Sequence, residues 1–159
     1  MMANPLAGSR LYARLGNVFT RPMWRLLGPP EGFAVLTTTG RKSGEPRSQP
    51  VRAIRKDRRV ALVAMMGERA QWLKNIRANP RVSIKLKAGV RQGLAHEVTD
   101  PAEKEWAASA YVDTRVCNDP FDYVVYEWGL PTRRNVEQAH RKWFDAGIPV
   151  IIELDDYGS

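Results

Sequence analysis

The stretch that decides the fold reads "VLTTTGRKSGEPRSQPV" and runs from Val35 to Val51. Its β-branched first half and its Gln-Pro-Val end predict two strands, and Gly40 and Gly44 predict the turn between them. A solvated turn needs a glycine and one or two polar residues. This one carries three cations within seven positions, so its composition asks for a further explanation.

An anion-binding site is the functional interpretation of this hairpin. Glycines allow backbone N–H groups to face outward, and Arg41, Lys42, Ser43 and Arg47 add cations and a hydroxyl beside them. Arginine offers a planar fork to phosphate or carboxylate, and lysine offers a point charge. A solvated charged turn is the plainer alternative. The nucleotide-binding pattern GxxxxGK[ST] is absent from the chain.

Strand patterns on both sides of the hairpin predict an antiparallel sheet. The expected strands cover residues 33–39, 50–54, 60–66, 82–86, 90–98 and 148–154. One short helix is expected over 68–78, and another begins after the N-cap Asp100, with Pro101 in its first turn and Glu103 to complete the cap. The fold class is therefore α+β, with about six mostly antiparallel strands that close into a small barrel flanked by helices.

Composition limits the chain to one ordinary domain. It has 159 residues, of which 43% are hydrophobic, so we expect a single domain over 1–159. Cys117 is the only cysteine, and with His96 and His140 it cannot build a zinc site, so we expect no metal. Apolar runs are too short to span a membrane and no secretory signal begins the chain, which favours a cytoplasmic protein.

The N-terminal segment 1–30 reads as a basic amphipathic helix. Leu11, Leu15, Val18 and Phe19 recur at helical spacing among arginines. Such a helix packs on its own domain, or it lies on a membrane surface, which would make residues 6–27 a peripheral membrane contact. The sequence leaves both interpretations open.

Charge is distributed unevenly along the chain. The formal net charge is +8, yet residues 41–59 carry eight basic against two acidic residues, and residues 97–127 carry eight acidic against two basic ones. A basic region favours an anionic partner. No aromatic stacking platform interleaves with the basic residues, so we do not expect a nucleic-acid binder.

Two segments together resemble a known family. "TTTGRKSG", followed by "RVALVAMMGERAQWLKNIRANPRVSI", is similar to the deazaflavin (F420)-dependent nitroreductase family. The resemblance covers roughly residues 33–98, and "GIPVIIEL" near the end is similar too. It implies a split β-barrel that binds coenzyme F420, an 8-hydroxy-5-deazaflavin.

The resemblance also implies which residues hold the coenzyme. The hairpin would bind its phosphate and oligoglutamate tail, and the following segments would flank its ring and support the site. The residues concerned are Arg41, Lys42, Ser43, Gly44, Arg47, Gln49, Pro50, Val51, Ala64, Met65, Met66, Trp72 and Asn75. As plainer alternatives, Trp72 fits a core residue and Asn75 a polar group near a helix end.

The implied activity is hydride transfer from the reduced coenzyme to an electron-poor and apolar acceptor, such as a quinone, an enone, an unsaturated lipid or a nitroaromatic compound. Relatives carry a short Tyr-rich segment before the last strand, whereas this chain has a longer acidic segment, so we expect a variable helical segment over the acceptor pocket at 99–147. Tyr111, Tyr123 and Tyr126 are its candidate proton donors, although each also fits an ordinary half-buried aromatic.

Three further hypotheses stay open at this point. One is a non-catalytic protein that binds the deazaflavin or a lipid. A second is a split barrel that binds FMN, because fold does not determine function, although the spread of Arg and Lys favours a longer polyanionic ligand. The third concerns assembly, since split barrels often form homodimers.

Overall fold

A computed structural model describes residues 18, 22–116, 119–120, 123, 127 and 129–156. Most of the expected N-terminal helix over 1–30, and with it most of the membrane contact expected at 6–27, lies outside these residues, as do Tyr126 and Cys117. Residues 22–27 are helical. Among the described residues, no helix combines the length and the apolar character needed to cross a membrane.

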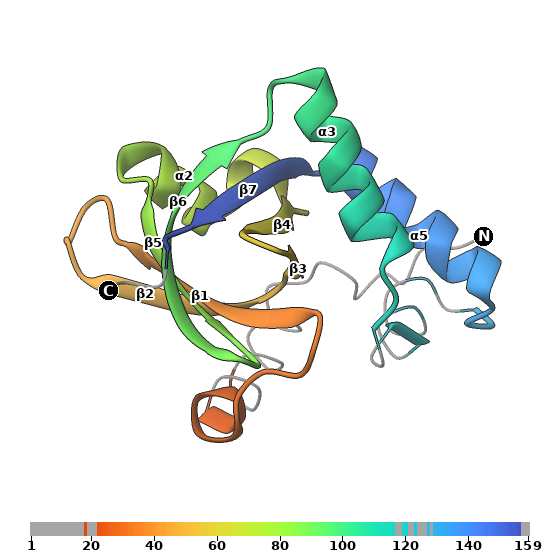
Figure 1. The fold of residues 1–159 in the computed structure, drawn as a ribbon, viewed down its shortest axis with the longest axis horizontal. Helices are drawn as coiled ribbons and strands as arrows, with labels where there is room; N and C mark the ends of the chain where they lie inside the picture. The colour runs from red at the N-terminus through yellow and green to blue at the C-terminus, as the bar shows by residue number, and fades with distance from the viewer. Residues whose placement is uncertain are drawn as a thin grey trace.

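A curled antiparallel sheet forms the body of the protein (Figure 1). Its strands are β1 (Phe33–Thr39), β2 (Pro46–Arg52), β3 (Ile54–Lys56), β4 (Arg59–Ala64), β5 (Arg81–Leu86), β6 (Gly89–Glu97) and β7 (Ile148–Leu154). Their order is β2-β1-β5-β6-β7-β4-β3, and every pairing is antiparallel. The two outermost strands follow each other in the chain, so the sheet curls back on itself as a split barrel. The α+β class and the split-barrel fold are confirmed.

The described residues form seven strands rather than about six, because one segment expected as a single strand belongs to two. The segment expected as a strand over 50–54 crosses Ala53, where the chain leaves β1 and joins β4 at the other end of the sheet. The Ala53 N–H donates instead to the Gly32 carbonyl, at 2.9 Å. A local sequence pattern does not reveal that the two halves of one extended segment pair with different partners.

The inside of the barrel is apolar and is covered by α2 (Gln71–Ala78). Leu36, Leu62, Ile84 and Ile152 point into it, and Leu73 and Ile76 of α2 pack on the same cluster. A helix was expected over 68–78. Residues Gly67–Arg69 form a separate 3-10 turn instead, because Ala70 is extended and interrupts the helix.

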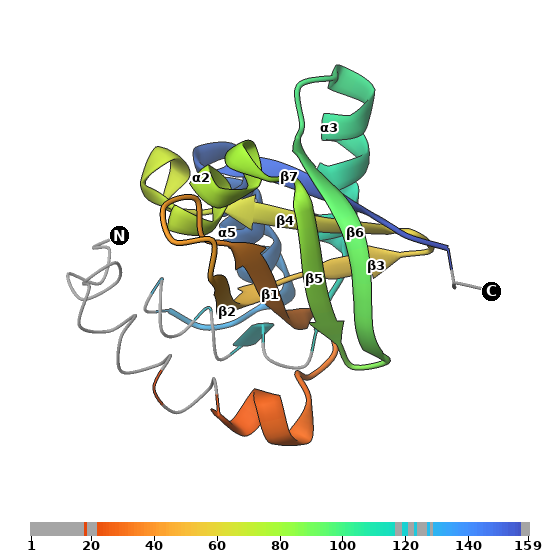
Figure 2. The ribbon, with the colours of Figure 1, turned by 90° about the vertical axis from the view of Figure 1, so that its left-hand side faces the viewer.

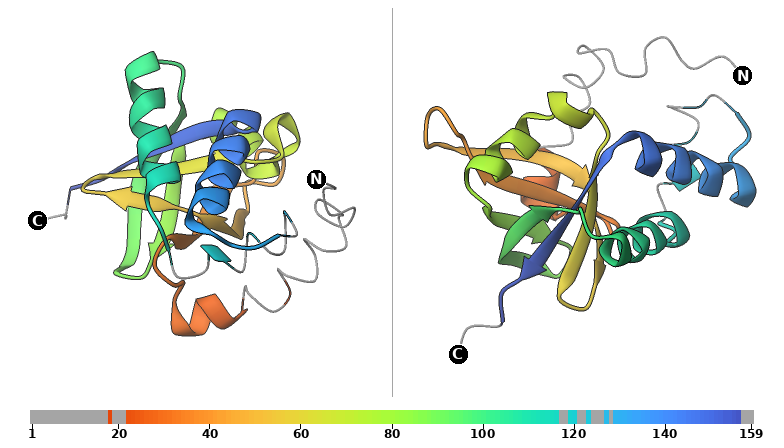
Figure 3. Two further views of the ribbon diagram at one scale, coloured as in Figure 1. Left: turned by 90° about the vertical axis from the view of Figure 1, so that its right-hand side faces the viewer. Right: turned by 90° about the horizontal axis from the view of Figure 1, so that it is seen from above.

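A second layer of helices packs on the outer face of β4 and β7 (Figure 3). It consists of α3 (Pro101–Ala108), the π-helical turn η2 (Ser109–Asp113) and α5 (Arg133–Ala146). The expected N-cap of α3 is confirmed, because the Asp100 carboxylate accepts from the Glu103 N–H at 3.0 Å. This layer comes from the described parts of the segment 99–147, which was expected to be helical.

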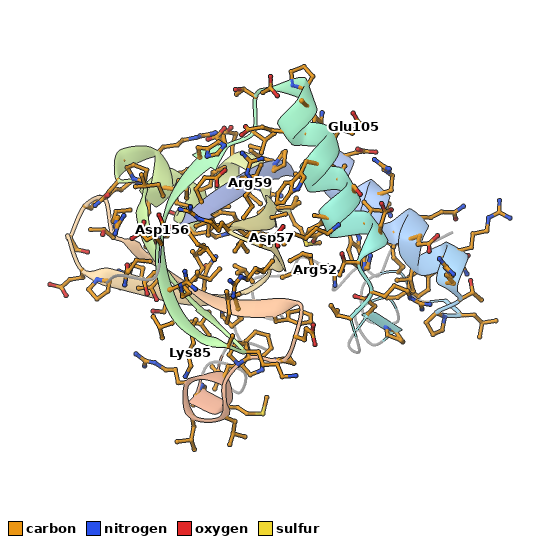
Figure 4. The ribbon with its side chains drawn as sticks, in the orientation of Figure 1. Arg52, Asp57, Arg59, Lys85, Glu105 and Asp156 are labelled. Atoms are coloured by element: carbon orange, nitrogen blue, oxygen red, sulfur yellow. The ribbon has the colours of Figure 1, made fainter. Side chains whose placement is uncertain are left out.

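A buried ion pair joins the helical layer to the end of β2. The Arg52 guanidinium donates to the Asp119 carboxylate at 2.5 Å, and both side chains are buried. The guanidinium also donates to the Thr114 carbonyl, at 3.0 Å, and the His140 ring nitrogen lies 3.5 Å from the same carboxylate. Figure 4 places Arg52 at this junction between the sheet and the helices.

The environment of Asp119 makes the junction sensitive to acid. Burial alone would raise the pKa of the Asp119 carboxyl, but the hydrogen-bonding His140 ring, the Val116 N–H at 2.7 Å and the Arg52 charge together lower that pKa below its ordinary value. The ion pair therefore stabilises the fold above the pKa of an unfolded aspartate, about 3.9, and this contribution is lost as the pH falls through the lower folded pKa.

We expect Asp119→Ala to lower the free energy of unfolding by about 3–5 kcal/mol at pH 7, because the Arg52 guanidinium would be left buried without its counter-ion. Urea unfolding measures this loss. The control Glu137→Ala breaks an exposed pair with Arg133 and should change stability little.

The difference in unfolding free energy between wild type and Asp119→Asn should narrow as the pH falls from 7 towards 3. A difference independent of pH would contradict this account of Asp119.

Candidate functional site

The hairpin between β1 and β2 is a tight, internally bonded loop. The Gly40 N–H donates to the Glu45 carbonyl at 2.8 Å, and the Gly44 N–H donates to the Gly40 carbonyl at 2.7 Å. Gly44 has a φ of 71°, which favours glycine. A Cβ on Gly40 would lie 2.8 Å from the Ser43 hydroxyl oxygen, so a side chain there would disturb the loop.

One buried amide ties this loop to α2 and to β1. Asn75 is only 5% exposed, and its side-chain oxygen accepts from the Arg41 N–H at 3.3 Å and from the Arg41 guanidinium at 3.1 Å. Its amide nitrogen donates to the Thr38 hydroxyl at 3.0 Å. Gln71, one turn earlier on α2, accepts from the Arg41 guanidinium at 3.1 Å. The Arg41 side chain is therefore held by neutral partners and keeps its charge available.

A pocket of about 740 Å³ opens beside the hairpin and α2, which lie next to each other in Figure 2. The residues that line it are Arg25, Val35, Thr38, Gly40, Arg41, Lys42, Ser43, Pro46, Arg47, Ser48, Gln49, Gln71, Trp72 and Asn75. Among the residues that the structure describes, this lining carries four cations and no carboxylate. Such a wall favours a ligand with several negative charges.

The cations of this pocket differ from many others in the protein. Arg52, Arg58, Arg59, Arg77 and Arg81 all form ion pairs with acidic residues. Within the described ranges, the four pocket cations form no ion pair at all. Cations without acidic partners that line one concave site are typical of an anion-binding pocket.

The structure brings seven of the predicted coenzyme residues together at the pocket. They are Arg41, Lys42, Ser43, Arg47, Gln49, Trp72 and Asn75. Gly44 shapes the hairpin, and Pro50 lies farther along β2; neither lines the pocket. Val51 and Ala64 pack with the barrel core, and Met65 and Met66 follow β4 with about half of their surface exposed.

Several lining residues were not predicted from the sequence. Sequence patterns could have identified Thr38 and Gln71 as lining residues. Thr38 belongs to the inward-facing set of β1, and Gln71 lies four residues before Asn75 on the same face of a helix. No sequence pattern could have identified Arg25, because nothing in the sequence places a residue ahead of β1 next to the hairpin. Val35, Gly40, Pro46 and Ser48 complete the lining.

The candidate proton donors lie apart from this pocket. Tyr111 is buried in the helical layer, where its ring packs against Phe144 with 6.1 Å between ring centroids. Tyr123 is buried in a small cluster with Val136 and Ala139. Neither lines the pocket, and Tyr126 falls outside the described residues.

Comparison with known proteins assigns the chain to a family. The model of the F420H(2)-dependent quinone reductase family matches residues 23–127, which include the hairpin and α2. The chain belongs to this family. It is therefore an F420-dependent oxidoreductase, and coenzyme F420 is its cofactor.

Solved structures agree with the fold of this F420H2-dependent quinone reductase family member. An F420-H2 dependent reductase (FDR-A) is 24% identical, with 78% of this chain and 94% of that chain covered and a TM-score of 0.50. A domain-swapped dimer is 22% identical, with 87% and 96% covered and a TM-score of 0.53. A conserved hypothetical protein of Mycobacterium tuberculosis is 16% identical, with 87% and 81% covered and a TM-score of 0.52.

The pocket of this family member fits an anionic coenzyme. Its volume lies within the range of about 300–1,000 Å³ that is typical of small-molecule sites. Its cations are unpaired within the described part of the chain, and Arg41 is oriented before any ligand binds. The indole of Trp72 and the amide of Gln49 border the same space and add an apolar surface and a hydrogen-bonding group.

We expect Asn75→Leu to weaken the binding of coenzyme F420 about five- to tenfold, because Arg41 loses the acceptor that orients it and the Thr38 hydroxyl loses its donor. A fluorescence titration measures the Kd, and urea unfolding should show a loss of about 1–3 kcal/mol. Gln71→Leu is the matched control, because it removes an exposed bond to the same guanidinium. Equal effects of the two substitutions on both measurements would contradict the special role of the buried amide.

Proposed function

We propose that this oxidoreductase transfers a hydride from reduced coenzyme F420 to an apolar, electron-poor acceptor, with quinones as the leading class and enones, unsaturated lipids and nitroaromatics as related acceptors. The observation that carries the proposal is the pocket whose described lining holds four cations, none of them ion-paired within the described residues, and no carboxylate. Membership of the quinone reductase family supports the choice of acceptor.

The proposal assigns distinct tasks to the residues of the pocket. Arg41, Lys42, Ser43 and Arg47 bind the anionic groups of the coenzyme, and Asn75 orients Arg41. Bound in its reduced form, the coenzyme supplies the hydride. The protein contributes position, charge complementarity and exclusion of water.

The family resemblance assigns tasks to the other predicted residues as well, of which Gln49 and Trp72 line the pocket and the rest do not. Gln49 and Trp72 contact the coenzyme from the pocket wall, and Gly44 keeps the hairpin in shape. Pro50, Val51, Ala64, Met65 and Met66 flank the ring. We propose one domain over 1–159, with the segment 99–147 covering the acceptor. The burial of Tyr111 and Tyr123 argues against both as proton donors, which leaves Tyr126 as the candidate.

The first test is a fluorescence titration with coenzyme F420 and, separately, with FMN. We expect coenzyme F420 to bind tightly and less tightly at high salt, because its charges meet exposed cations. Lys42→Ala and Arg47→Ala should each raise its Kd about tenfold, which corresponds to about 1.4 kcal/mol. Arg134→Ala on α5 removes one charge away from the pocket and should leave the Kd unchanged.

The second part of this test adds an acceptor. Reduced coenzyme F420 mixed with the protein and menadione should be oxidised faster than without protein, and recovery of the coenzyme's fluorescence measures the rate. Binding without acceptor-dependent oxidation would point to a non-catalytic carrier. Tighter binding of FMN than of coenzyme F420 would point to a flavin-binding split barrel and would contradict the proposal.

We further propose that the N-terminal region, residues 6–27, contacts the surface of the membrane, where apolar quinones reside. Leu26 and Leu27 are 86% and 78% exposed, and Met23 is half exposed on the same short helix. Exposed apolar side chains next to cations suit the interface of an anionic bilayer. The protein would then be cytoplasmic and peripheral to the membrane. The domain-swapped dimer among similar folds supports a homodimer as its assembly.

Flotation with liposomes tests the membrane contact. We expect wild type to float with vesicles that contain an anionic lipid, and Leu26→Ser/Leu27→Ser to float several-fold less, because two apolar side chains no longer enter the interface. Leu130→Ser is the matched control, since Leu130 is equally exposed but precedes α5. Absence of wild-type protein from the floating fraction would refute the contact.

A further inference from the structure

Arg25 lines the same pocket as the cations of the hairpin, although it comes from the short helix that precedes β1. The hairpin cations Arg41, Lys42 and Arg47 lie after β1 in the chain. The pocket wall is therefore assembled from both ends of this strand. Arg25 is exposed and lines the pocket, and within the described ranges it forms no ion pair.

Two contacts hold the helix of Arg25 in place. Trp24 is buried, and its ring packs against Phe33 at the start of β1, with 5.4 Å between ring centroids. The Lys85 ammonium of β5 donates to the Arg25 carbonyl at 2.7 Å. Figure 4 shows Lys85 pointing towards this helix. The backbone of Arg25 is thus anchored to the sheet, while its guanidinium keeps its donors.

The lining of the pocket includes residues from different levels of β1. Its lining includes Val35 at one level of the strand and Gly40 beyond its end. At about 3.3 Å per residue, this part of the chain spans roughly 16 Å. Lys85, which holds Arg25, pairs with Val35 in the sheet register, so the backbone of Arg25 is anchored at the level of the pocket remote from the hairpin.

The hairpin has enough donors of its own to bind one phosphate, because Arg41, Lys42, Ser43 and Arg47 all line the pocket there. Arg25 is then available for a second anionic group. The hairpin has fixed donors and suits a compact group with several oxygens. Arg25 presents one guanidinium on an exposed side chain, and this suits a carboxylate on a flexible part of a ligand.

We infer that Arg25 forms a second anion subsite, which binds a carboxylate of the ligand while the hairpin binds its phosphate. The pocket thereby selects a ligand with two anionic groups separated along its length. This inference rests on the proposed coenzyme site and adds a specificity-determining residue to it. Arg25 then binds the ligand, whereas Leu26 and Leu27 on the same helix contact the membrane.

The test compares two forms of the coenzyme in fluorescence titrations: coenzyme F420 with its acidic tail, and a form shortened to the phosphate. For the full coenzyme we expect Arg25→Gln to raise the Kd about five- to tenfold, and Arg134→Gln, which removes the same charge from α5, to leave it unchanged. For the shortened form, Arg25→Gln should have no effect, whereas Arg47→Gln should still weaken binding.

Each other outcome overturns a defined part of this account. Equal Kd values for Arg25→Gln and Arg134→Gln with the full coenzyme would remove Arg25 from the site and leave the proposed function intact. Equal weakening of both coenzyme forms by Arg25→Gln would mean that Arg25 shares the phosphate with the hairpin, which refutes a second subsite. Failure of wild type to bind the full coenzyme would overturn the proposed function, and the subsite with it.

Discussion

The buried amide of Asn75 is the interaction on which the pocket depends. A buried polar side chain is stable only when its hydrogen bonds are made, and Asn75 makes three of them to two separate parts of the barrel wall. One bond fixes Thr38 inside β1, and the other two fix Arg41 at the hairpin. The positions of α2, β1 and the hairpin are thereby coupled, and the orientation of Arg41 is set by neutral groups that leave its charge uncompensated.

Uncompensated charge at the pocket contrasts with the pairing of cations elsewhere in the protein. Arg59, Arg77 and Arg81, for example, each have an acidic partner that compensates their charge. The pocket cations repel one another in the free protein, and a polyanionic ligand relieves this repulsion on binding. Affinity for the coenzyme and the strong salt dependence that we expect of it therefore have the same physical cause.

The junction at Arg52 connects this site to the helical layer. β2 begins beside the pocket with Pro46 and Arg47 and ends at Arg52, whose guanidinium is buried with Asp119. The strand that carries part of the pocket wall is thus fixed at its far end to the segment proposed to cover the acceptor. The interruption between β2 and β3 at Ala53 makes this arrangement feasible, because β3 can pair with β4 while β2 stays paired with β1.

The sequence by itself determined the short-range features. Alternation predicted the strands, Gly40 and Gly44 predicted the turn, and the cations of the hairpin predicted an anion site, whereas the coenzyme and the parts of Trp72 and Asn75 were implied by the family resemblance alone. These features depend on strand period, helix period and turn stereochemistry, which act over a few residues.

Only the tertiary structure decided which residues act together. It divided one expected strand at Ala53, and it buried Tyr111 and Tyr123 in the helical layer. It also brought Arg25 to the pocket wall. The bond from Arg41 to Asn75 crosses 34 positions and the pair of Arg52 with Asp119 crosses 67. Whether a cation is paired or free to bind a ligand depends on such long-range packing, which local sequence patterns do not encode.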